Sequence, residues 1–420
     1  MLPEGFIAHL TESVGPEAAG RFMTAAALEA SVSVRLNPFK TPSSPDPMLE
    51  GSAPVPWSPF GRILGQRPTF TLQPLFHAGA YYVQDSSAMF AGHVARRLLE
   101  AIPAPEGRPV RVLDLCAAPG GKTTDLAASL RLRYGDGFLL VANEVMRARS
   151  GVLSDNVAIW GDPNVVVTSV DPAAFASFEG YFDLILADVP CSGEGMFRKD
   201  AKAVGDWSEQ TVELCAARQK RILGDVWPAL RGGGALVYST CTFSRAENDA
   251  NVAWMASALD ADPVPPADRF EGVLPTEYGS LLLPGLVPGE GQYVAAVRRV
   301  SGPPPSRKGA RELERLRPLR SGVQKGEWKG RDFIPSADWA LSLSFVRGEW
   351  PEVEVDRSTA LHYLHRDTLV LRDAPKGFVL LTYGGLPLGF VKNLGSRCNN
   401  LLPQGRRILM DIDTGRILRR

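Results

Sequence analysis

Two cysteines stand directly after short apolar runs that have the composition of buried strands. Cys191 follows the run that ends in Asp188-Val189-Pro190, and Cys241 follows the run that ends in Ser239-Thr240. Either cysteine alone is most simply interpreted as a structural thiol, since free cysteine is among the most buried residue types. Two of them at the ends of strands, with the Asp188 carboxylate three residues before one, favour a chemical function instead.

A turn rich in small residues lies after an earlier apolar run, at Asp114-Leu115-Cys116-Ala117-Ala118-Pro119-Gly120-Gly121-Lys122-Thr123. Small residues at a strand-to-helix turn let the backbone approach a ligand and expose helix N-terminal N–H groups. One interpretation is a P-loop, which requires GxxxxGK[ST], but Cys116 occupies the first glycine position. A nucleoside fits better, because Glu144 ends the next predicted strand, where an acidic side chain accepts hydrogen bonds from ribose hydroxyls. A tight turn without any ligand is the third interpretation.

The absence of a dinucleotide-binding pattern in the turn, together with the two thiols, favours S-adenosylmethionine as the nucleoside. The GxGxxG of dinucleotide-binding enzymes is absent, and S-adenosylmethionine carries a ribose but no phosphate to be cradled. Carbon 5 of a pyrimidine is too weakly nucleophilic to take a methyl group, whereas a thiolate that adds to carbon 6 makes it nucleophilic. Asp188 could stabilise that adduct at ring nitrogen 3. The residues alone leave open which cysteine adds and which assists elimination.

The elements that position these residues alternate between strand and helix. Apolar runs rich in Val, Ile and Leu predict strands at 110–115, 138–143, 164–169, 182–188 and 234–240. Helical patterns lie between most of them, at 122–133, 145–160 and 207–230. Ser244 and Glu247 form a capping-box pattern, which predicts another helix after the last strand. Together these patterns indicate an α/β fold with a parallel sheet, whose ligands bind beyond the carboxyl ends of the strands.

The regions on either side of this alternating core have other patterns. Residues 4–30 predict two short helices, and residues 31–36 alternate like a strand, so we expect a small α+β module at the N-terminus. Residues 289–300 predict a last strand of the core, and Pro303-Pro304-Pro305 marks a linker. The remainder has short strand-like segments and turns. The expected domains are an N-terminal module, a catalytic domain and a β-rich domain, at 1–55, 56–300 and 301–420.

Composition limits the classes of protein that fit. The chain has 420 residues, with 46 Lys/Arg, 46 Asp/Glu and 45% apolar residues. That length predicts two to four domains of ordinary globular composition, and excludes a collagen-like or disulfide scaffold. Five scattered cysteines without a CxxC exclude a zinc ribbon and predict free thiols in a reducing compartment, and the histidines show no metal spacing. Without a signal peptide or a membrane-length apolar run, we expect a cytoplasmic location.

Three motifs agree in order and spacing with one family. CAAPGGKT at 116–123, DVPCSGEGMFRKD at 188–200 and YSTCT at 238–242 resemble the Sun/Nop-type RNA cytosine-5 methyltransferases, and the match extends upstream to residues 81–87. The resemblance covers at least residues 75–300. It implies a class I, Rossmann-like methyltransferase domain with a mostly parallel seven-stranded sheet, which uses S-adenosylmethionine. The flanking parts look like the bacterial branch that modifies small-subunit ribosomal RNA, whose C-terminal part is similar to a PUA-like RNA-binding domain.

The resemblance also implies roles for single residues. The family's nucleophile is the cysteine of the Thr-Cys motif, here Cys241, and its Pro-Cys cysteine, here Cys191, assists product release. The positions that bind the methyl donor correspond to Cys116, Ala117, Ala118, Pro119, Gly120, Gly121, Lys122, Glu144, Asp171 and Asp188. Asp171 follows the third predicted strand, where an acidic group could meet the adenine amino group.

An RNA partner is compatible with the neutral total because the charge is unevenly spread. Residues 301–420 contain 21 Lys/Arg and 13 Asp/Glu, whereas residues 1–300 contain 25 and 33. Residues 307–331 form a basic stretch around Trp328 that suits phosphate contact and base stacking, with a solvated linker as the alternative. Phe197-Arg198-Lys199 could hold phosphates beside the target base.

The expected partner is small-subunit (16S) ribosomal RNA or the 30S particle, bound by a monomer without metal. The target cytosine must leave its stack to reach the thiol. Transfer RNA is an alternative substrate. A non-catalytic RNA-binding protein is an alternative function, against which both intact cysteines argue.

Overall fold

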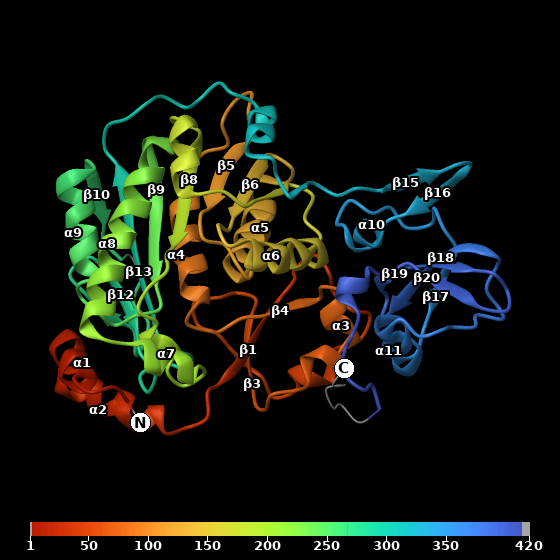
Figure 1. Cartoon of the computed structure of the whole chain (residues 1–420), viewed down its shortest axis with the longest axis horizontal. Helices are drawn as coiled ribbons and strands as arrows, with labels where there is room; N and C mark the ends of the chain where they lie inside the picture. The colour runs from red at the N-terminus through yellow and green to blue at the C-terminus, as the bar shows by residue number, and fades with distance from the viewer. Residues whose placement is uncertain (1, 267, 414–420) are drawn as a thin grey trace.

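A central sheet runs through the middle of the molecule and contains the five strands that the apolar runs predict (Figure 1). They are β5 (Val110–Asp114), β6 (Phe138–Asn143), β7 (Val165–Thr168), β8 (Phe182–Asp188) and β9 (Leu230–Thr240). The structure is a computed structural model that describes residues 2–266 and 268–413. These strands are parallel in the order β9-β8-β5-β6-β7, and nearly all their residues are buried. The prediction of a parallel sheet covered on both faces is confirmed.

The expectation of seven strands is wrong, because the described residues form a ten-stranded sheet. Five antiparallel strands complete it, namely β10 (Ala261–Val264), β11 (Leu274–Pro275), β12 (Gly279–Leu282), β13 (Gln292–Arg299) and β14 (Arg320–Ser321). The predicted last strand is β13. Strands β10, β11 and β14 have two to four residues, too few for a periodicity to be detected. Strand β14 follows the proline-rich linker and pairs with β7, so the chain returns to the sheet edge there.

Helices cover both faces of the sheet, and neighbouring residues of one strand enter different cores. They are α4 (Met89–Glu100), α5 (Gly121–Tyr134) and α6 (Arg147–Trp160) on one face, with α8 (Glu209–Val226) and α9 (Asp249–Ala258) on the other. The first core lies between the sheet and α4, α5 and α6, and the second core lies between the sheet and α8 and α9. On β5, Val112 packs in the first core and Leu113 packs in the second core. The helices predicted at 122–133, 145–160 and 207–230 are α5, α6 and α8. In the described residues, no helix is long and apolar enough to cross a membrane.

The N-terminal module is split into a helical pair and a small sheet. Helices α1 (Phe6–Val14) and α2 (Pro16–Ala26) meet at Gly15-Pro16 as predicted, and pack on the second core beside the short helix α7 (Ala201–Asp206) (Figure 1). The sheet has the order β2-β3-β1-β4, with strands β2 (Ala53–Pro54), β3 (Gly61–Leu64), β1 (Val32–Leu36) and β4 (Tyr81–Val83). Strand β1 is the predicted strand, and the sheet extends to Val83, past residue 55.

The C-terminal part is rich in strands, as predicted. Its elements are the hairpin β15 (Gly326–Lys329) and β16 (Asp332–Pro335), the sheet of β17 (Glu352–Glu354), β18 (Gly377–Tyr383), β19 (Leu386–Asn393) and β20 (Cys398–Asn400), and the helices α10 (Ala337–Leu341) and α11 (Arg357–His365). Helix α11 packs beside α3 (Pro74–His77) of the N-terminal half. Arg406 joins this part to α6, because its Nε lies 2.9 Å from Asp155 and its Nη1 lies 2.6 Å from Asp338.

A buried arginine connects the N-terminal sheet to the small-residue turn. Arg35 of β1 is fully buried, and its Nε donates to Gln84 Oε1 at 2.8 Å. Its Nη2 donates to the carbonyl of Gly121 at 3.1 Å and to Thr124 Oγ1 at 2.5 Å, which fixes the first turn of α5. The guanidinium also lies over the Trp160 ring, 4.6 Å from its centroid. This single side chain therefore holds three separate segments together.

We predict that Arg35→Ala lowers the free energy of unfolding by about 3–5 kcal/mol, because removing one member of a buried polar cluster leaves its partners unsatisfied. Urea denaturation followed by circular dichroism measures this loss. Arg372→Ala, at an exposed position, is the matched control and should change stability little. Equal stability of the two variants would contradict the structural role of Arg35.

Candidate active site

The loops after β8 and β9 bring the two predicted cysteines into contact. The strands are neighbours, with Asp188 paired to Ser239. The Sγ atoms of Cys191 and Cys241 lie 3.1 Å apart, and the backbone N–H of Cys241 donates to Cys191 Sγ at 3.3 Å. Both cysteines are free and half-buried. The predicted proximity of the two thiols is therefore present in the folded chain.

Several contacts lock these two loops against each other. Gly195 N donates to the carbonyl of Cys241 at 2.8 Å, and the hydroxyls of Ser192 and Thr242 lie 2.9 Å apart. The fully buried carboxylate of Glu194 accepts from Phe243 N at 2.8 Å and from Trp207 Nε1 at 2.9 Å. A Cβ on Gly195 would lie 2.9 Å from the carbonyl oxygen of Cys241, so only glycine permits this close approach of the two loops. The relative position of the sulfurs is thus fixed by both backbones.

A lysine and an aspartate lie beside the thiols. Lys122 Nζ is 2.8 Å from Asp188 Oδ2, and Asp188 Oδ1 accepts from Ser239 Oγ at 2.9 Å. Burial lowers the pKa of Lys122, but the charge and hydrogen bond of Asp188, together with other negative charges nearby, outweigh the burial, so the pKa lies above its ordinary value. A negative charge on Cys241 raises it further. Lys122 is therefore a permanent cation between a carboxylate and the sulfur of Cys241.

Two cavities meet at this cluster. The first, of about 430 Å³, is lined by Glu144 and Asp171 among others, and the second, of about 340 Å³, by Tyr82 and Lys122 among others. Four residues line both cavities, namely Cys116, Ala118, Asp188 and Cys241. The second cavity is also lined by Ala117, Pro119 and Gly121. The residues implied to bind one donor therefore border two spaces, and Cys241 stands between them.

The first cavity has the acidic groups that a nucleoside needs. Glu144, after β6, is buried; it accepts from Met146 N at 2.9 Å and lies 3.4 Å from Arg149. Asp171, after β7, caps the 3-10 helix that follows it, by accepting from Ala173 N at 3.0 Å. Gly120, the N-cap residue just before α5, has a φ of 115°, a backbone conformation that favours glycine. These residues fit a nucleoside cofactor with a ribose and an amino-substituted base.

Part of the predicted phosphate contact is wrong. Phe197 is buried and packs on Phe6, with ring centroids 4.9 Å apart. The Arg198 side chain is only 9% exposed, and its Nε lies 2.9 Å from Glu290 Oε2, so it is used within the fold. Lys199 is exposed and lines the second cavity, although it lies 3.0 Å from Asp85. A short basic motif cannot reveal which of its cations already have buried partners.

The second cavity contains residues that the sequence did not single out for chemistry. Tyr82 and Gln84 come from the upstream segment of the family motif, Gln292 is the first residue of β13, and Glu290 comes just before that strand. Gln292 Nε2 lies 3.3 Å from Asp188 Oδ1. These four residues could not be predicted as neighbours of the cysteines, because they lie far from them along the chain. The only sequence signal for them was the family resemblance at residues 81–87, which contain Tyr82 and Gln84.

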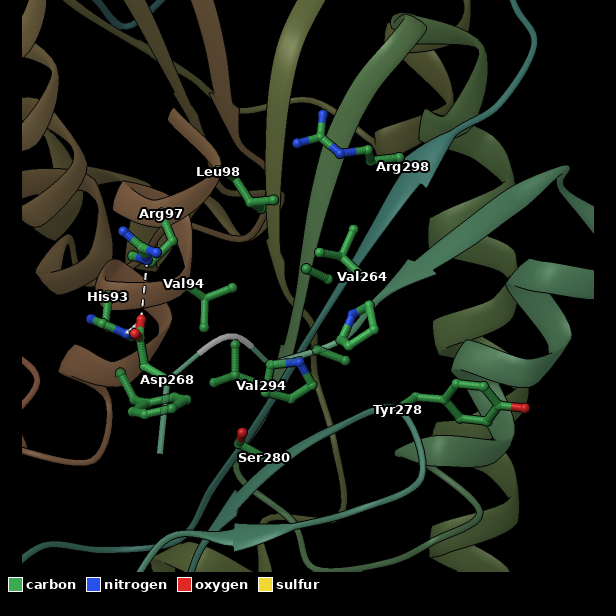
Figure 2. A pocket seen from close by; sticks show the side chains of 15 residues that line it. His93, Val94, Arg97, Leu98, Val264, Asp268, Tyr278, Ser280, Val294 and Arg298 are labelled. Atoms are coloured by element: carbon green, nitrogen blue, oxygen red, sulfur yellow. Dashed lines mark hydrogen bonds and ion pairs between the residues drawn. The ribbon is translucent and has the colours of Figure 1, made fainter. Parts of the chain in front are cut away.

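Another cavity, of about 160 Å³, contains none of the predicted site residues. It lies between α4 and the strands β10, β12 and β13, and Figure 2 shows its largely apolar lining. On its rim, Asp268 Oδ2 lies 3.0 Å from His93 and 3.1 Å from Arg97. The cysteine cluster is therefore distinct from this cavity. Among the described residues, no group of three or more His, Cys, Asp or Glu side chains could hold a metal ion.

Three family models match separate parts of the chain. Residues 103–297 match the family model described as "16S rRNA methyltransferase RsmB/F". Residues 2–86 match the model of the "N-terminal domain of 16S rRNA methyltransferase RsmF", and residues 351–408 match the model of the "Methyltransferase RsmF PUA domain". The ribosomal RNA small subunit methyltransferase F of Erwinia tasmaniensis is 30% identical over 91% of this chain and 92% of its own. The chain belongs to this family. The corresponding Escherichia coli protein is 34% identical over 72% of this chain and 64% of its own.

Solved structures agree with the methyltransferase fold. A methyltransferase homolog protein from Pyrococcus horikoshii aligns with a TM-score of 0.57 and 25% identity, over 70% of this chain and 94% of its own. NSun6 from the same organism aligns with a TM-score of 0.58 and 19% identity, over 71% and 98%. The α/β methyltransferase fold and the C-terminal PUA domain are thus confirmed, and membership in this S-adenosylmethionine-dependent family decides against the P-loop interpretation.

The methyltransferase also has a buried carboxyl group with a raised pKa at the end of β5, just before Leu115 and Cys116, which line the first cavity. Burial raises the pKa of Asp114 to about 7, although Thr123 Oγ1 donates to its Oδ2 at 2.6 Å. Its Oδ1 has no partner in the described part of the chain. Since the unfolded chain releases this proton near pH 4, the contribution of Asp114 to stability is lost as pH rises toward 7.

We therefore predict that Asp114→Asn increases the melting temperature more at pH 8 than at pH 5, both compared with the unmodified protein. The amide keeps the size of the side chain and removes the charge that burial disfavours. Differential scanning calorimetry across this pH range measures the effect. Asp373→Asn, at an exposed position, is the control, and a shift for Asp114→Asn that is equal at both pH values would refute the argument.

Proposed function

We propose that this methyltransferase transfers a methyl group from S-adenosylmethionine to carbon 5 of a cytosine in small-subunit ribosomal RNA. The observation that supports this chemistry is the sulfur pair, 3.1 Å apart, where the two cavities meet. A methyl donor on one side and a base on the other would both reach Cys241. In a methyltransferase, paired thiols at such a junction favour addition to a pyrimidine ring.

The first cavity is assigned to the cofactor. Its volume of about 430 Å³ is within the range of small-molecule sites. Glu144 would accept from the ribose hydroxyls, and Asp171 from the adenine amino group, while Cys116 and Ala118 of the small-residue turn line the same cavity. When bound, S-adenosylmethionine supplies an electrophilic methyl group. Burial raises the pKa of the Cys116 thiol, which therefore stays neutral beside it.

The second cavity is assigned to the flipped cytosine. The Cys241 thiolate adds to carbon 6, a sulfur–carbon bond forms, and the electron pair of the 5,6 double bond becomes available at carbon 5. Lys122 provides positive charge beside the attacking sulfur, and Asp188 in its protonated form would donate a hydrogen bond to ring nitrogen 3. The hydrogen bond with Cys241, together with burial, raises the pKa of Cys191 well above its ordinary value. Cys191 thus retains its proton, which favours Cys241 as the nucleophile.

Release reverses the addition. Once carbon 5 bears the methyl group, its proton passes to solvent water, the electron pair of the broken carbon–hydrogen bond re-forms the 5,6 double bond, and Cys241 departs as a thiolate that accepts a hydrogen bond from the Cys191 thiol. Cys191 is the group we assign to assist this step, because its sulfur contacts that of Cys241. The reaction therefore divides the two cysteines between addition and elimination, as the family resemblance implies.

The two roles predict different outcomes for two alanine variants. Cys191→Ala should accumulate a covalent RNA adduct, because addition proceeds and release is impaired, whereas Cys241→Ala should abolish both turnover and adduct. Denaturing gels of labelled RNA and single-turnover methylation assays measure these outcomes. Cys398→Ala, in the C-terminal sheet, is the matched control for removing a thiol. Turnover by Cys241→Ala would show the nucleophile assignment to be wrong.

The basic stretch at 307–331 divides into two parts in the structure. Arg320 pairs with Asp338 at 2.7 Å and lies at the sheet edge, so the first part serves the packing of the chain. The hairpin β15–β16 projects away from the central sheet (Figure 1) and presents Trp328, which is 71% exposed, beside exposed Lys329 and Arg331. A stacking aromatic flanked by cations suits single-stranded RNA. We assign this hairpin to RNA outside the target site.

We predict that Trp328→Ala weakens RNA binding by about 1–3 kcal/mol, the range for loss of one base stack. Fluorescence anisotropy with a small-subunit RNA fragment at fixed salt gives the dissociation constant. Val346→Ala removes another exposed apolar side chain of the same region and should leave binding unchanged. An unchanged dissociation constant for Trp328→Ala would exclude the hairpin from the interface.

The substrate itself requires a direct comparison. Single-turnover assays with naked small-subunit RNA, 30S particles and transfer RNA would rank the three, and the proposal expects a ribosomal substrate to be methylated fastest. Faster methylation of transfer RNA would overturn the ribosomal assignment while keeping the chemistry. A monomer acting in the cytoplasm completes the proposal.

A further inference from the structure

Glu247 has a position that its sequence pattern did not predict. The capping box of Ser244 and Glu247 is absent, because α9 begins at Asp249 and the Ser244 hydroxyl has no partner among the described atoms. Glu247 is instead fully buried beneath the catalytic loops. Its Oε2 accepts from Ser192 N at 3.1 Å and from Gln219 Nε2 at 2.7 Å. The carboxylate is therefore bonded to the residue that follows Cys191.

Gln219 completes a clamp around the same cysteine. Its Nε2 also donates to the carbonyl of Pro190 at 3.0 Å, and its Oε1 accepts from Asn251 Nδ2 at 2.7 Å. The carbonyl before Cys191 and the N–H after it are thus both held by one buried pair. Because the pair binds the backbone, it sets the direction in which the sulfur of Cys191 points.

The clamp also places a negative charge beside the thiols. Burial raises the pKa of Glu247 to about 7, against the effect of its hydrogen bonds, and the charge of Glu194 raises it further. The titratable groups that interact with Glu247 are Cys191, Glu194, Cys215 and Tyr238. A charged Glu247 disfavours a thiolate at Cys191, and this effect is present above about pH 7 and lost below it.

We propose that Glu247 is a positioning residue that clamps Cys191 against Cys241 and biases the proton between the two sulfurs toward Cys191. Cys241 is then the thiolate that adds to the base. The proton count is simple, since one proton stays on Cys191 and none on Cys241. This inference rests on the proposed roles of the two cysteines, and it gives a reason within the fold for the asymmetry between them.

The test measures the two thiolates without RNA or cofactor. Iodoacetamide alkylates thiolates. The folded, full-length protein is alkylated at pH 8 and then digested, and mass spectrometry of the peptides gives the ratio of the alkylation rate of Cys241 to that of Cys191. We expect Cys241 to react several-fold faster in the unmodified protein, and Glu247→Gln to reduce that ratio severalfold, because the amide keeps the length and removes the charge. Glu213→Gln, on the exposed face of α8, is the matched control. An unchanged ratio in folded Glu247→Gln would overturn the proposal.

A pH series on the unmodified protein decides the matter even if Glu247→Gln does not fold. Because Glu247 gains a proton near pH 7, the ratio of Cys241 to Cys191 alkylation should fall between pH 8 and pH 6. A ratio that stays constant over this range would overturn the proposal. Neither result depends on methylation, so failure of the proposed function would appear separately, in the Cys191→Ala and Cys241→Ala assays.

Discussion

The contact between the sulfurs of Cys191 and Cys241 imposes a constraint that much of the structure serves. Two thiols 3.1 Å apart need two chain segments that lie side by side with their side chains directed at each other. Adjacent parallel strands supply that arrangement, because β8 and β9 end at the same edge of the sheet with their loops side by side. The close approach of Gly195 to the carbonyl of Cys241, and the buried Glu194 between both loops, then hold the distance.

The electrostatics of the site depend on the same contact. A pair of sulfurs that shares a proton needs an asymmetric environment if one is to attack and the other is not. Lys122 stands on the side of Cys241, and the buried carboxylate of Glu247 interacts with Cys191. A positive charge that interacts with Cys241 and a negative charge that interacts with Cys191 both favour the proton on Cys191. Under the proposed roles, this environment would make the two thiols chemically different while keeping them in contact.

The parts of this architecture that were predictable are those with local causes. Strands such as Phe182–Asp188 are apolar because both faces of the sheet are covered, and residues at their ends fall at the ligand edge by geometry. Short strands such as β14 could not be predicted, because two residues are too few to show an alternation of apolar and polar residues. The role of Glu247 could not be predicted for a different reason. Its spacing from Ser244 suits a capping box, whereas its actual partners, Ser192 N and Gln219, are brought to it only by the tertiary fold. Likewise, Arg198 cannot be recognised as structural until Glu290 is beside it.

The N-terminal module extends this dependence to the far end of the chain. Its sheet supplies Arg35, which holds the first turn of α5, where Gly121 and Lys122 line the second cavity. Its helices supply Phe6, which packs on Phe197, and His9, which lies 3.4 Å from the Glu194 carboxylate that bonds Phe243. One module therefore touches both the cofactor turn and the loops of the two cysteines. Such an element is part of the active-site scaffold in addition to any contact it makes with RNA, because removing it would release both halves of the site at once.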